Sequence, residues 1–256
     1  MFPHFLAKTG SSWFDSWATR HSSPVTRHRK MNEKIATFLN QPSSLPKLVV
    51  IYGPTASGKT SMSIDIAKHI DSQVISADSR QIYRMMDIGT AKVTSDEMQG
   101  IPHHLIDIRD PHESYSVGEW VRDAQEIITW LHEKGKIPIV CWGTGLYIDA
   151  LIHQFDIPEI PADEVLRSEL EGFRQKQGNE ALWQKLADID PDYAADLHPN
   201  NYHYVIRGIE VFTHSWVSKK DLKTKKDAKY DALLLCPWEW TREELYGRID
   251  ARALVM

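Results

Sequence analysis

The fold is decided by residues 48–60, LVVIYGPTASGKT. Residues 48–52 are apolar, and a run of this length is typical of a buried parallel strand. A glycine-rich turn follows, and then a helical spacing of apolar side chains begins near Thr60. A turn in this position points backbone N–H groups and a helix N-terminus at an anion. We therefore expect a di- or triphosphate to bind at Gly53, Pro54, Thr55, Ala56, Ser57, Gly58, Lys59 and Thr60.

Two side chains add chemistry to this loop. Lys59 supplies positive charge, and the hydroxyl of Thr60 is a candidate ligand of Mg²⁺. The backbone of such a loop recognises phosphate and not the group attached to it, so ATP, GTP and other pyrophosphates all remain possible. The loop taken alone is equally compatible with a P-loop kinase or NTPase.

Further buried strands are expected on both sides of the loop sequence. Apolar runs at 74–75, 137–141 and 232–236 predict three of them, and helices are predicted from 60 to 70, from 116 to 135 and from 241 onward. This alternation indicates an α/β fold, a parallel sheet flanked by helices. We expect a P-loop core at 47–157, an inserted helical subdomain at 158–207, and a return to the core at 208–256.

The first 46 residues are expected to be a disordered extension and linker. Residues 1–30 carry five basic side chains and one acidic side chain, Asp15, so they are also compatible with a mitochondrial presequence. Another possibility is that Met31 is the true start. We expect a cytoplasmic protein, or a mitochondrial one if these residues are a presequence.

Composition narrows the class of protein. The formal net charge is -5, which argues against nonspecific coating of nucleic acid but permits a local basic groove. No apolar run approaches the roughly 18 residues that would cross a bilayer. The two cysteines, Cys141 and Cys236, are far apart in sequence and suggest neither a disulfide framework nor a zinc site. We expect a monomer without membrane contact.

Asp78 follows the second predicted strand directly. Open α/β sheets bind their ligands at the carboxyl ends of the strands, so Asp78 is expected to face the phosphate loop. It could act there as a general base, help to hold magnesium, or simply cap a turn. His103 and His104 are adjacent and point apart in an extended chain, which favours a structural role over metal binding.

Several ordered motifs resemble the tRNA dimethylallyltransferase family over residues 47–256. They are the phosphate loop, ISADSRQIYR at 75–84, MDIGTAK at 86–92, PHHLID at 102–107, YSVGE at 115–119, GTGLY at 143–147, HPN at 198–200 and RIDAR at 248–252. Members transfer a dimethylallyl group from its diphosphate to the exocyclic amine of the adenosine 3′ to the tRNA anticodon. The resemblance implies a P-loop NTPase-like fold and an enzyme with this activity.

The resemblance also implies roles for individual residues. Asp78 would be the general base, Thr144 would touch the reacting groups, and Lys59, Arg252 and Mg²⁺ on Thr60 would stabilise the departing pyrophosphate. The acceptor base must leave its stack to reach such a pocket, which suits the single-stranded anticodon loop. Contacts with tRNA are implied for Asp78, Ser79, Arg80, Gln81, Thr144, Arg167, His203, Tyr204, Val205, Ile206 and Arg207.

Three features depart from the family pattern. Trp142 stands where the family has a glycine, Tyr204 replaces an arginine, and the sequence ends at Met256 where relatives continue through further helices. An inactive truncated paralogue that binds donor or RNA is therefore a second alternative to the transferase.

Overall fold

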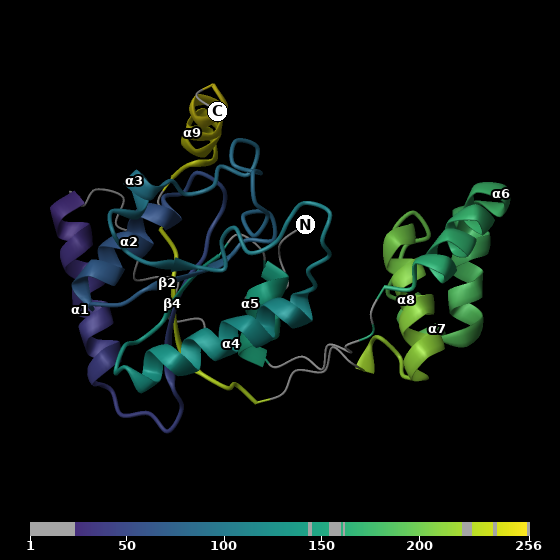
Figure 1. Cartoon of the computed structure of the whole chain (residues 1–256), viewed down its shortest axis with the longest axis horizontal. Coiled ribbons are helices and arrows are strands. Elements are labelled where there is room, and N and C mark those ends of the chain that lie inside the picture. Colours follow the sequence, from purple (N-terminus) through teal and green to yellow (C-terminus); the bar gives the residue numbers. More distant parts are fainter. Residues whose placement is uncertain are drawn as a thin grey trace.

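A parallel five-stranded sheet forms the centre of the larger part of the molecule (Figure 1). The structure is a computed structural model that describes residues 24–142, 145–153, 160, 162–221, 227–237 and 240–254. The strand order is β3-β2-β4-β1-β5, and every pairing is parallel. The bounds are Lys47–Ile51 for β1, Val74–Ala77 for β2, His103–His104 for β3, Ile139–Trp142 for β4 and Asp231–Leu235 for β5. The expected α/β class is confirmed, and β3 is a strand that the sequence did not predict.

Strand β1, which lies between β4 and β5, alternates its side chains between two apolar layers. Val49 and Ile51 pack with helices α1 and α2, Pro24–Asn40 and Lys59–His69. Leu48 and Val50 face the layer that contains α4 and α5, Val117–Glu133 and Gly145–His153. Because both faces are covered, the strand is apolar at every position from 48 to 51, as expected of a parallel strand.

Helix α1 corrects the expectation that residues 1–46 are disordered. Met31, Ile35 and Phe38 lie three or four positions apart and are buried against the sheet, so they form one apolar stripe. Lys47, the first residue of β1, donates hydrogen bonds of 2.5–2.7 Å to three carbonyl groups at the end of the helix. The remaining part of the expected extension, residues 1–23, lies outside the described residues.

Helix α4 begins as predicted, with a capping box between Ser116 and Glu119. Its Trp120 is fully buried, and the indole donates a 3.0 Å hydrogen bond to the carbonyl of Ser76 in β2. The same indole stacks on Tyr147 of α5 with ring centroids 4.8 Å apart. These contacts fix α4 and α5 at the carboxyl end of β2, where Asp78 follows.

Three helices form a separate cluster, α6 at Glu164–Ile189, α7 at Pro191–Ala194 and α8 at Tyr202–Ser215 (Figure 1). Helix α8 passes through residue 207, the expected end of the helical subdomain. Beyond that residue α8 still packs against α7. Gly208 lies so close to Tyr193 that a Cβ atom at this position would be 2.9 Å from the tyrosine ring. The division into domains stays a prediction.

The remaining helices are α3 at Ser95–Met98 and α9 at Arg242–Ala253. Helix α9 begins after Thr241, as predicted, with a second capping box between Thr241 and Glu244. None of the helices in the described ranges is long and apolar enough to cross a membrane.

Candidate active site at the phosphate loop

The phosphate loop joins β1 to α2 and depends on two glycines. Gly58 caps α2 with a φ of 98°, a left-handed conformation that glycine adopts readily. A Cβ atom on Gly53, which has a φ of 149°, would lie 3.0 Å from the Ser57 hydroxyl and 3.4 Å from the Cys236 sulfur. The chain can therefore fold tightly over the carboxyl end of β1.

Lys59 crosses the inside of this loop. Its ammonium group donates hydrogen bonds to the carbonyl oxygens of Gly53 at 3.0 Å and Pro54 at 2.7 Å. Burial lowers the pKa of Lys59, and the nearby Cys141 and Asp78 oppose that shift. The lysine and the aspartate that the sequence singled out are thus close enough to interact.

The loop has an unsatisfied polar group that suits an anion. The Ser57 hydroxyl is buried and has no hydrogen-bond partner among the described residues. A phosphate oxygen would satisfy it, whereas an apolar ligand would not. Thr60, the expected magnesium ligand, is exposed at the start of α2, and its hydroxyl and a phosphate oxygen are oxygen ligands of the kind that Mg²⁺ prefers.

Helix α9 contributes two arginines to the same region. Arg248 donates a 2.8 Å hydrogen bond to the carbonyl of Ala56, and its guanidinium lies 4.3 Å from the ring centroid of Trp240. Arg252, one turn later, donates a 3.0 Å hydrogen bond to the carbonyl of Ala91. Its positive charge contributes to the lowered pKa of Lys59. Sequence reasoning gave Arg248 and Trp240 no role, although Arg248 and Arg252 share one helical face.

Asp78 comes directly after β2 and is half-buried. One of its carboxylate oxygens accepts a 2.9 Å hydrogen bond from the backbone N–H of Arg80, the turn-capping contact that was one of the expected alternatives. Its charge acts both on Lys59 and on Tyr147. Burial, with smaller contributions from Tyr83 and Asp78, raises the pKa of Tyr147 to about 12. The negative charge of Asp78 therefore favours the protonated forms of both Lys59 and Tyr147.

The segment after Asp78 is held by polar side chains. Gln81 donates a 3.2 Å hydrogen bond to the carbonyl of Ala91, the same oxygen that Arg252 contacts. The buried ammonium of Lys92 is paired with Asp87 at 2.6 Å and Asp107 at 2.5 Å. Burial opposes the charged form of Lys92, but these hydrogen bonds outweigh it and raise its pKa.

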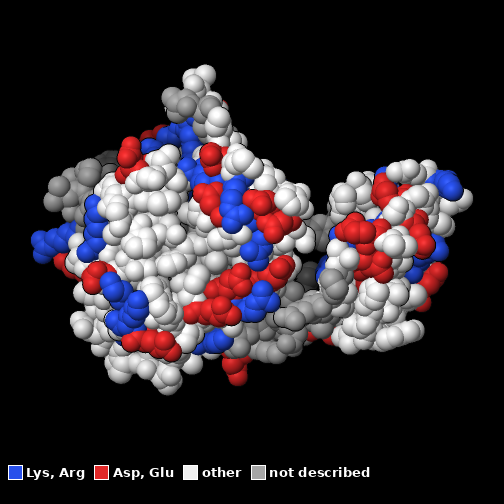
Figure 2. All heavy atoms as spheres, viewed as in Figure 1, with Lys and Arg blue, Asp and Glu red and all other residues white. Residues whose placement is uncertain are grey.

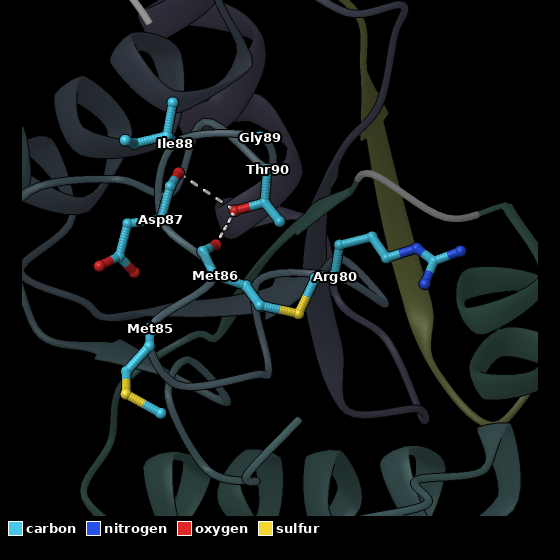
Figure 3. Close-up of a pocket in the computed structure, with 7 residues that line it drawn as sticks. All are labelled: Arg80, Met85, Met86, Asp87, Ile88, Gly89 and Thr90. Atoms are coloured by element: carbon cyan, nitrogen blue, oxygen red, sulfur yellow. Dashed lines mark hydrogen bonds between the residues drawn. The ribbon is translucent and has the colours of Figure 1, made fainter. Parts of the chain in front are cut away.

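An open cavity of about 470 Å³ lies beside this segment, lined by Arg80, Met85, Met86, Asp87, Ile88, Gly89 and Thr90. Figure 3 shows Thr90 within the segment, hydrogen bonded to the carbonyls of Met86 and Asp87, with the Met86 side chain extending toward Arg80. Ser79 is half-buried and Arg80 is exposed. Residues 78–81 therefore lie together at the carboxyl end of β2.

Comparison with known proteins identifies the family of this chain. The family profile described as IPP transferase matches residues 81–256, well over half of the chain. The chain belongs to the IPP transferase family. A tRNA dimethylallyltransferase of Halalkalibacterium halodurans is 48% identical over 208 residues, which is 80% of this chain and 66% of that protein. Another, from Caldanaerobacter subterraneus subsp. tengcongensis, is 40% identical over 210 residues, 80% of this chain and 67% of that protein.

Solved structures of relatives support the same fold for this chain. A tRNA isopentenylpyrophosphate transferase from Bacillus halodurans has a TM-score of 0.51 at 48% identity, over 80% of this chain and 64% of that one. A eukaryotic dimethylallyltransferase acting on tRNA has a TM-score of 0.67 at 29% identity, over 81% of this chain and 52% of that one. The chain thus spans about two thirds or less of the length of these relatives.

The helical cluster α6–α8 holds the remaining residues for which tRNA contact is expected. Arg167 and Arg207 both bind Glu210, whose side chain is 0% exposed. Arg167 makes two hydrogen bonds to it, of 2.9 and 3.0 Å, and the backbone N–H of Asp163 adds one of 2.7 Å. Sequence reasoning missed Glu210, because only its position on the inner face of α8 marks it.

Two of the expected tRNA contacts need correction. Val205 is 0% exposed and Ile206 is 8% exposed, and both pack in the apolar core of the helical cluster. The helical period of α8 explains this, because it turns Val205 and Ile206 toward the core while the neighbouring His203 and Tyr204 are exposed. Side-chain contact with RNA therefore stays a prediction for His203 and Tyr204 but is wrong for the two buried residues.

Thr144, Trp142, His103 and His104 are the other residues that the sequence analysis singles out. Thr144 lies outside the described residues, as does the side chain of Trp142. His103 contacts the carbonyl of Ile101 at 2.8 Å, and His104 contacts the side-chain amide of Gln73 at 2.7 Å. Burial lowers the pKa of both imidazoles. These are structural contacts on the edge strand β3.

Charge on the face shown in Figure 2 is mixed. Basic and acidic side chains alternate over both parts of the molecule, and Lys and Arg gather where α9 meets the sheet domain. This location coincides with the contacts that Arg248 and Arg252 make to the phosphate loop and to Ala91. Arg248 and Arg252 therefore bring two positive charges to this region, although the formal net charge of the chain is -5.

Proposed function

We propose that this chain transfers a dimethylallyl group from dimethylallyl diphosphate to the exocyclic amine of the adenosine 3′ to the anticodon of tRNA. The observation that carries the proposal is the grouping of Lys59, Asp78 and Arg252 at one phosphate loop in a member of the IPP transferase family. A general base and a diphosphate site are the two things that this reaction requires.

The phosphate loop would hold the diphosphate of the donor. The Ser57 hydroxyl, the loop N–H groups and the N-terminus of α2 all favour an anion there. On binding, Lys59 would exchange the carbonyls of Gly53 and Pro54 for phosphate oxygens. As the allylic carbon–oxygen bond breaks, Lys59 and Arg252 would stabilise the charge that develops on the departing pyrophosphate.

Asp78 would remove the proton from the attacking amine. The adenosine nitrogen forms the new carbon–nitrogen bond, the pyrophosphate leaves with the electron pair of the broken bond, and the amine proton passes to the carboxylate. The hydrogen bond from the N–H of Arg80 orients one carboxylate oxygen for this step. We include Thr144 as a contact of the reacting groups, on the strength of the family resemblance.

Magnesium is part of the proposal. Thr60 would be its protein ligand, together with oxygens of the diphosphate, and the ion would neutralise charge on the leaving group. The tRNA anticodon stem-loop would lie across the edge of the sheet that bears residues 78–81. His203, Tyr204, Arg167 and Arg207 on the helical cluster are the further proposed contacts with tRNA.

The test is transfer of label from dimethylallyl diphosphate to an unmodified anticodon stem-loop in the presence of Mg²⁺. We expect label on the adenosine 3′ to the anticodon, and none when that nucleotide is replaced by guanosine. Absence of transfer by the purified chain and by a version extended at its C-terminus with the helices of a relative would overturn the proposal. Nucleotide hydrolysis unaffected by the donor would instead indicate an NTPase.

A further inference from the structure

Two side chains near α9 bind neighbouring carbonyl groups of the phosphate loop. Arg248 of α9 donates a 2.8 Å hydrogen bond from its Nε atom to the carbonyl of Ala56. Trp240, two positions before α9, donates a 3.3 Å hydrogen bond from its indole to the carbonyl of Ser57. The Arg248 guanidinium lies 4.3 Å from the centroid of the Trp240 ring, so the two donors also attract each other. Together they join the loop to α9, which projects from the sheet domain (Figure 1).

The backbone of Ala56 has a conformation that is unfavourable for an alanine. Its φ is 61°, in the left-handed region, where the Cβ atom approaches the backbone too closely. Gly58, two positions later, has a φ of 98°, which glycine adopts without this penalty. Because φ sets the direction of the carbonyl relative to the preceding chain, a rotation of Ala56 to a negative φ would break the hydrogen bond from Arg248. That charged hydrogen bond therefore stabilises the left-handed form.

The two bound carbonyls also determine the direction of two loop N–H groups. In a trans peptide unit, the C=O and the N–H point in opposite directions. The N–H of Ser57 therefore points away from Arg248, and it reaches the carbonyl of Pro54 at 3.3 Å. Lys59 donates to this same carbonyl at 2.7 Å. The N–H of Gly58 points away from the indole in the same way, so the outer contacts orient N–H groups that an anion would use.

The side of the loop that Arg248 contacts is not the side that suits an anion. It presents the carbonyl oxygens of Ala56 and Ser57, the negative ends of two peptide dipoles, to the arginine and the indole. Those oxygens would repel a diphosphate placed between them and Arg248. The arginine is therefore arranged to hold the loop and not the ligand.

We propose that Arg248 and Trp240 are positioning residues for diphosphate binding, which hold the phosphate loop in its anion-binding conformation through the carbonyls of Ala56 and Ser57. This inference rests on the proposed function, in which the loop binds the diphosphate of the donor. Without the two contacts, Ala56 would populate negative φ values, and only a fraction of the chains would present a competent loop. The apparent affinity for the anion falls by that fraction.

The test uses Arg248→Met, which removes the guanidinium and keeps an apolar stem of similar length. Arg242→Met is the matched control. Arg242 is also an exposed arginine of α9, hydrogen bonded at 3.1 Å to the hydroxyl of Tyr246 and 5.7 Å from the centroid of its ring. Both variants remove one positive charge from α9, so their difference measures the contact with the loop.

A second substitution, Ala56→Gly, distinguishes positioning from direct binding. Glycine adopts the left-handed conformation without help, so the loop should depend less on Arg248 when residue 56 has no Cβ atom. If Arg248 instead touched the anion, its loss would cost the same whichever residue occupied position 56. A role of Arg248 in the stability of α9 alone would likewise be unaffected by this change in the loop.

Binding of inorganic pyrophosphate with Mg²⁺ is measured by calorimetry. Arg248→Met should weaken it by about tenfold, because a charged hydrogen bond is lost, and Arg242→Met by about twofold or less. In the Ala56→Gly background the loss from Arg248→Met should shrink to about threefold or less. Trp240→Phe, which keeps a ring but removes the indole N–H, should weaken binding by about threefold and supplies a second variant in case Arg248→Met folds poorly.

Two results would overturn the inference and leave the proposed function intact. One is an equal loss from Arg248→Met with alanine and with glycine at position 56, which would show that Arg248 does not act through that residue. The other is an equal loss in Arg248→Met and Arg242→Met, which would reduce the effect to long-range charge. A wild type that binds no pyrophosphate would overturn the proposed function and this inference together.

Discussion

Asp78 and Glu210 show how the surroundings of a single carboxylate decide its role. Asp78 is half-buried, accepts a hydrogen bond from the backbone N–H of Arg80, and lies near Lys59. Glu210 is fully buried and is bound by two arginines and a backbone N–H. We propose that the first exchanges a proton with a ligand, whereas the second joins α6 to α8 through its two arginines.

For Asp78 we predict that Asp78→Asn lowers the rate of prenyl transfer by about 10²-fold or more, because the amide cannot accept the amine proton. Binding of dimethylallyl diphosphate, measured by calorimetry, should persist since the phosphate loop is unchanged. Asp65→Asn, on the same sheet domain within α2, serves as the control and should transfer normally. Undiminished transfer by Asp78→Asn would remove Asp78 from the role of base.

For Glu210 we predict that Glu210→Ala destabilises the fold by about 3–5 kcal/mol, because it leaves two arginines without their buried partner. Glu164→Ala is the matched control. Glu164 also pairs with Arg167, at 3.6 Å, but its side chain is 81% exposed, so about 0–1 kcal/mol is expected. Chemical denaturation at pH 7 measures both, and equal losses would contradict the assigned role.

The contribution of Glu210 to the free energy of unfolding depends on pH, and the direction of this dependence follows from its pKa shift. Burial disfavours the charged form of Glu210, but the hydrogen bonds from Arg167 and Arg207 outweigh it and lower the pKa below its usual value. The stabilisation from Glu210 is therefore fully present above the unfolded-state pKa and is lost as the pH falls through the lower folded-state value. The free energy of unfolding should fall more steeply with acid in the wild type than in Glu210→Gln.

At the scale of elements, α1 and α9 are helices whose packing partners the sequence does not predict. Their sequences carry recognisable apolar or capping signals, but such signals do not say which surface a helix covers. Helix α1 lies within the expected disordered extension, a prediction that rests on the basic and polar composition of residues 1–30 and does not consider the stripe of Met31, Ile35 and Phe38. Helix α9 was predicted as a helix, while its contact with the phosphate loop, 192 positions earlier, was not.

The burial of α1 predicts that Ile35→Ala destabilises the protein by about 2–5 kcal/mol, because the side chain is 0% exposed within the layer that covers Val49 and Ile51. Glu33→Ala, on the exposed face of the same helix, should change the free energy of unfolding by about 0.5 kcal/mol or less. Thermal or chemical denaturation distinguishes them. A neutral Ile35→Ala would mean that α1 does not pack on the sheet in solution.

At the scale of the whole molecule, the phosphate loop connects ligand binding to global stability. We predict that inorganic pyrophosphate with Mg²⁺, at about 100 times its Kd, stabilises the protein by about 2.7 kcal/mol, because only the folded chain presents the loop. A rise in Tm on addition of the ligand measures this. Removal of Mg²⁺ with EDTA should reduce the rise without unfolding the apoprotein.

Lys59→Ala should lose this thermal shift, since it removes the ammonium from the inside of the loop. Lys68→Ala is the control. Lys68 is on the same helix α2 but at its other end, where it binds the side chain of Gln99. A full shift in Lys59→Ala would show that pyrophosphate binds elsewhere.

Local features of this protein can be predicted from its amino-acid sequence. The strand–loop–helix at 48–60, the capping boxes and the motif order indicated the sheet, the phosphate site and the family, because each depends on residues that are close together in the chain. Only the tertiary structure brought Arg248 to Ala56, joined Arg167 and Arg207 through Glu210, and buried Val205 and Ile206. Those contacts depend on packing between segments that are distant in the sequence. The spacing of residues within one segment does not indicate which other segment packs against it.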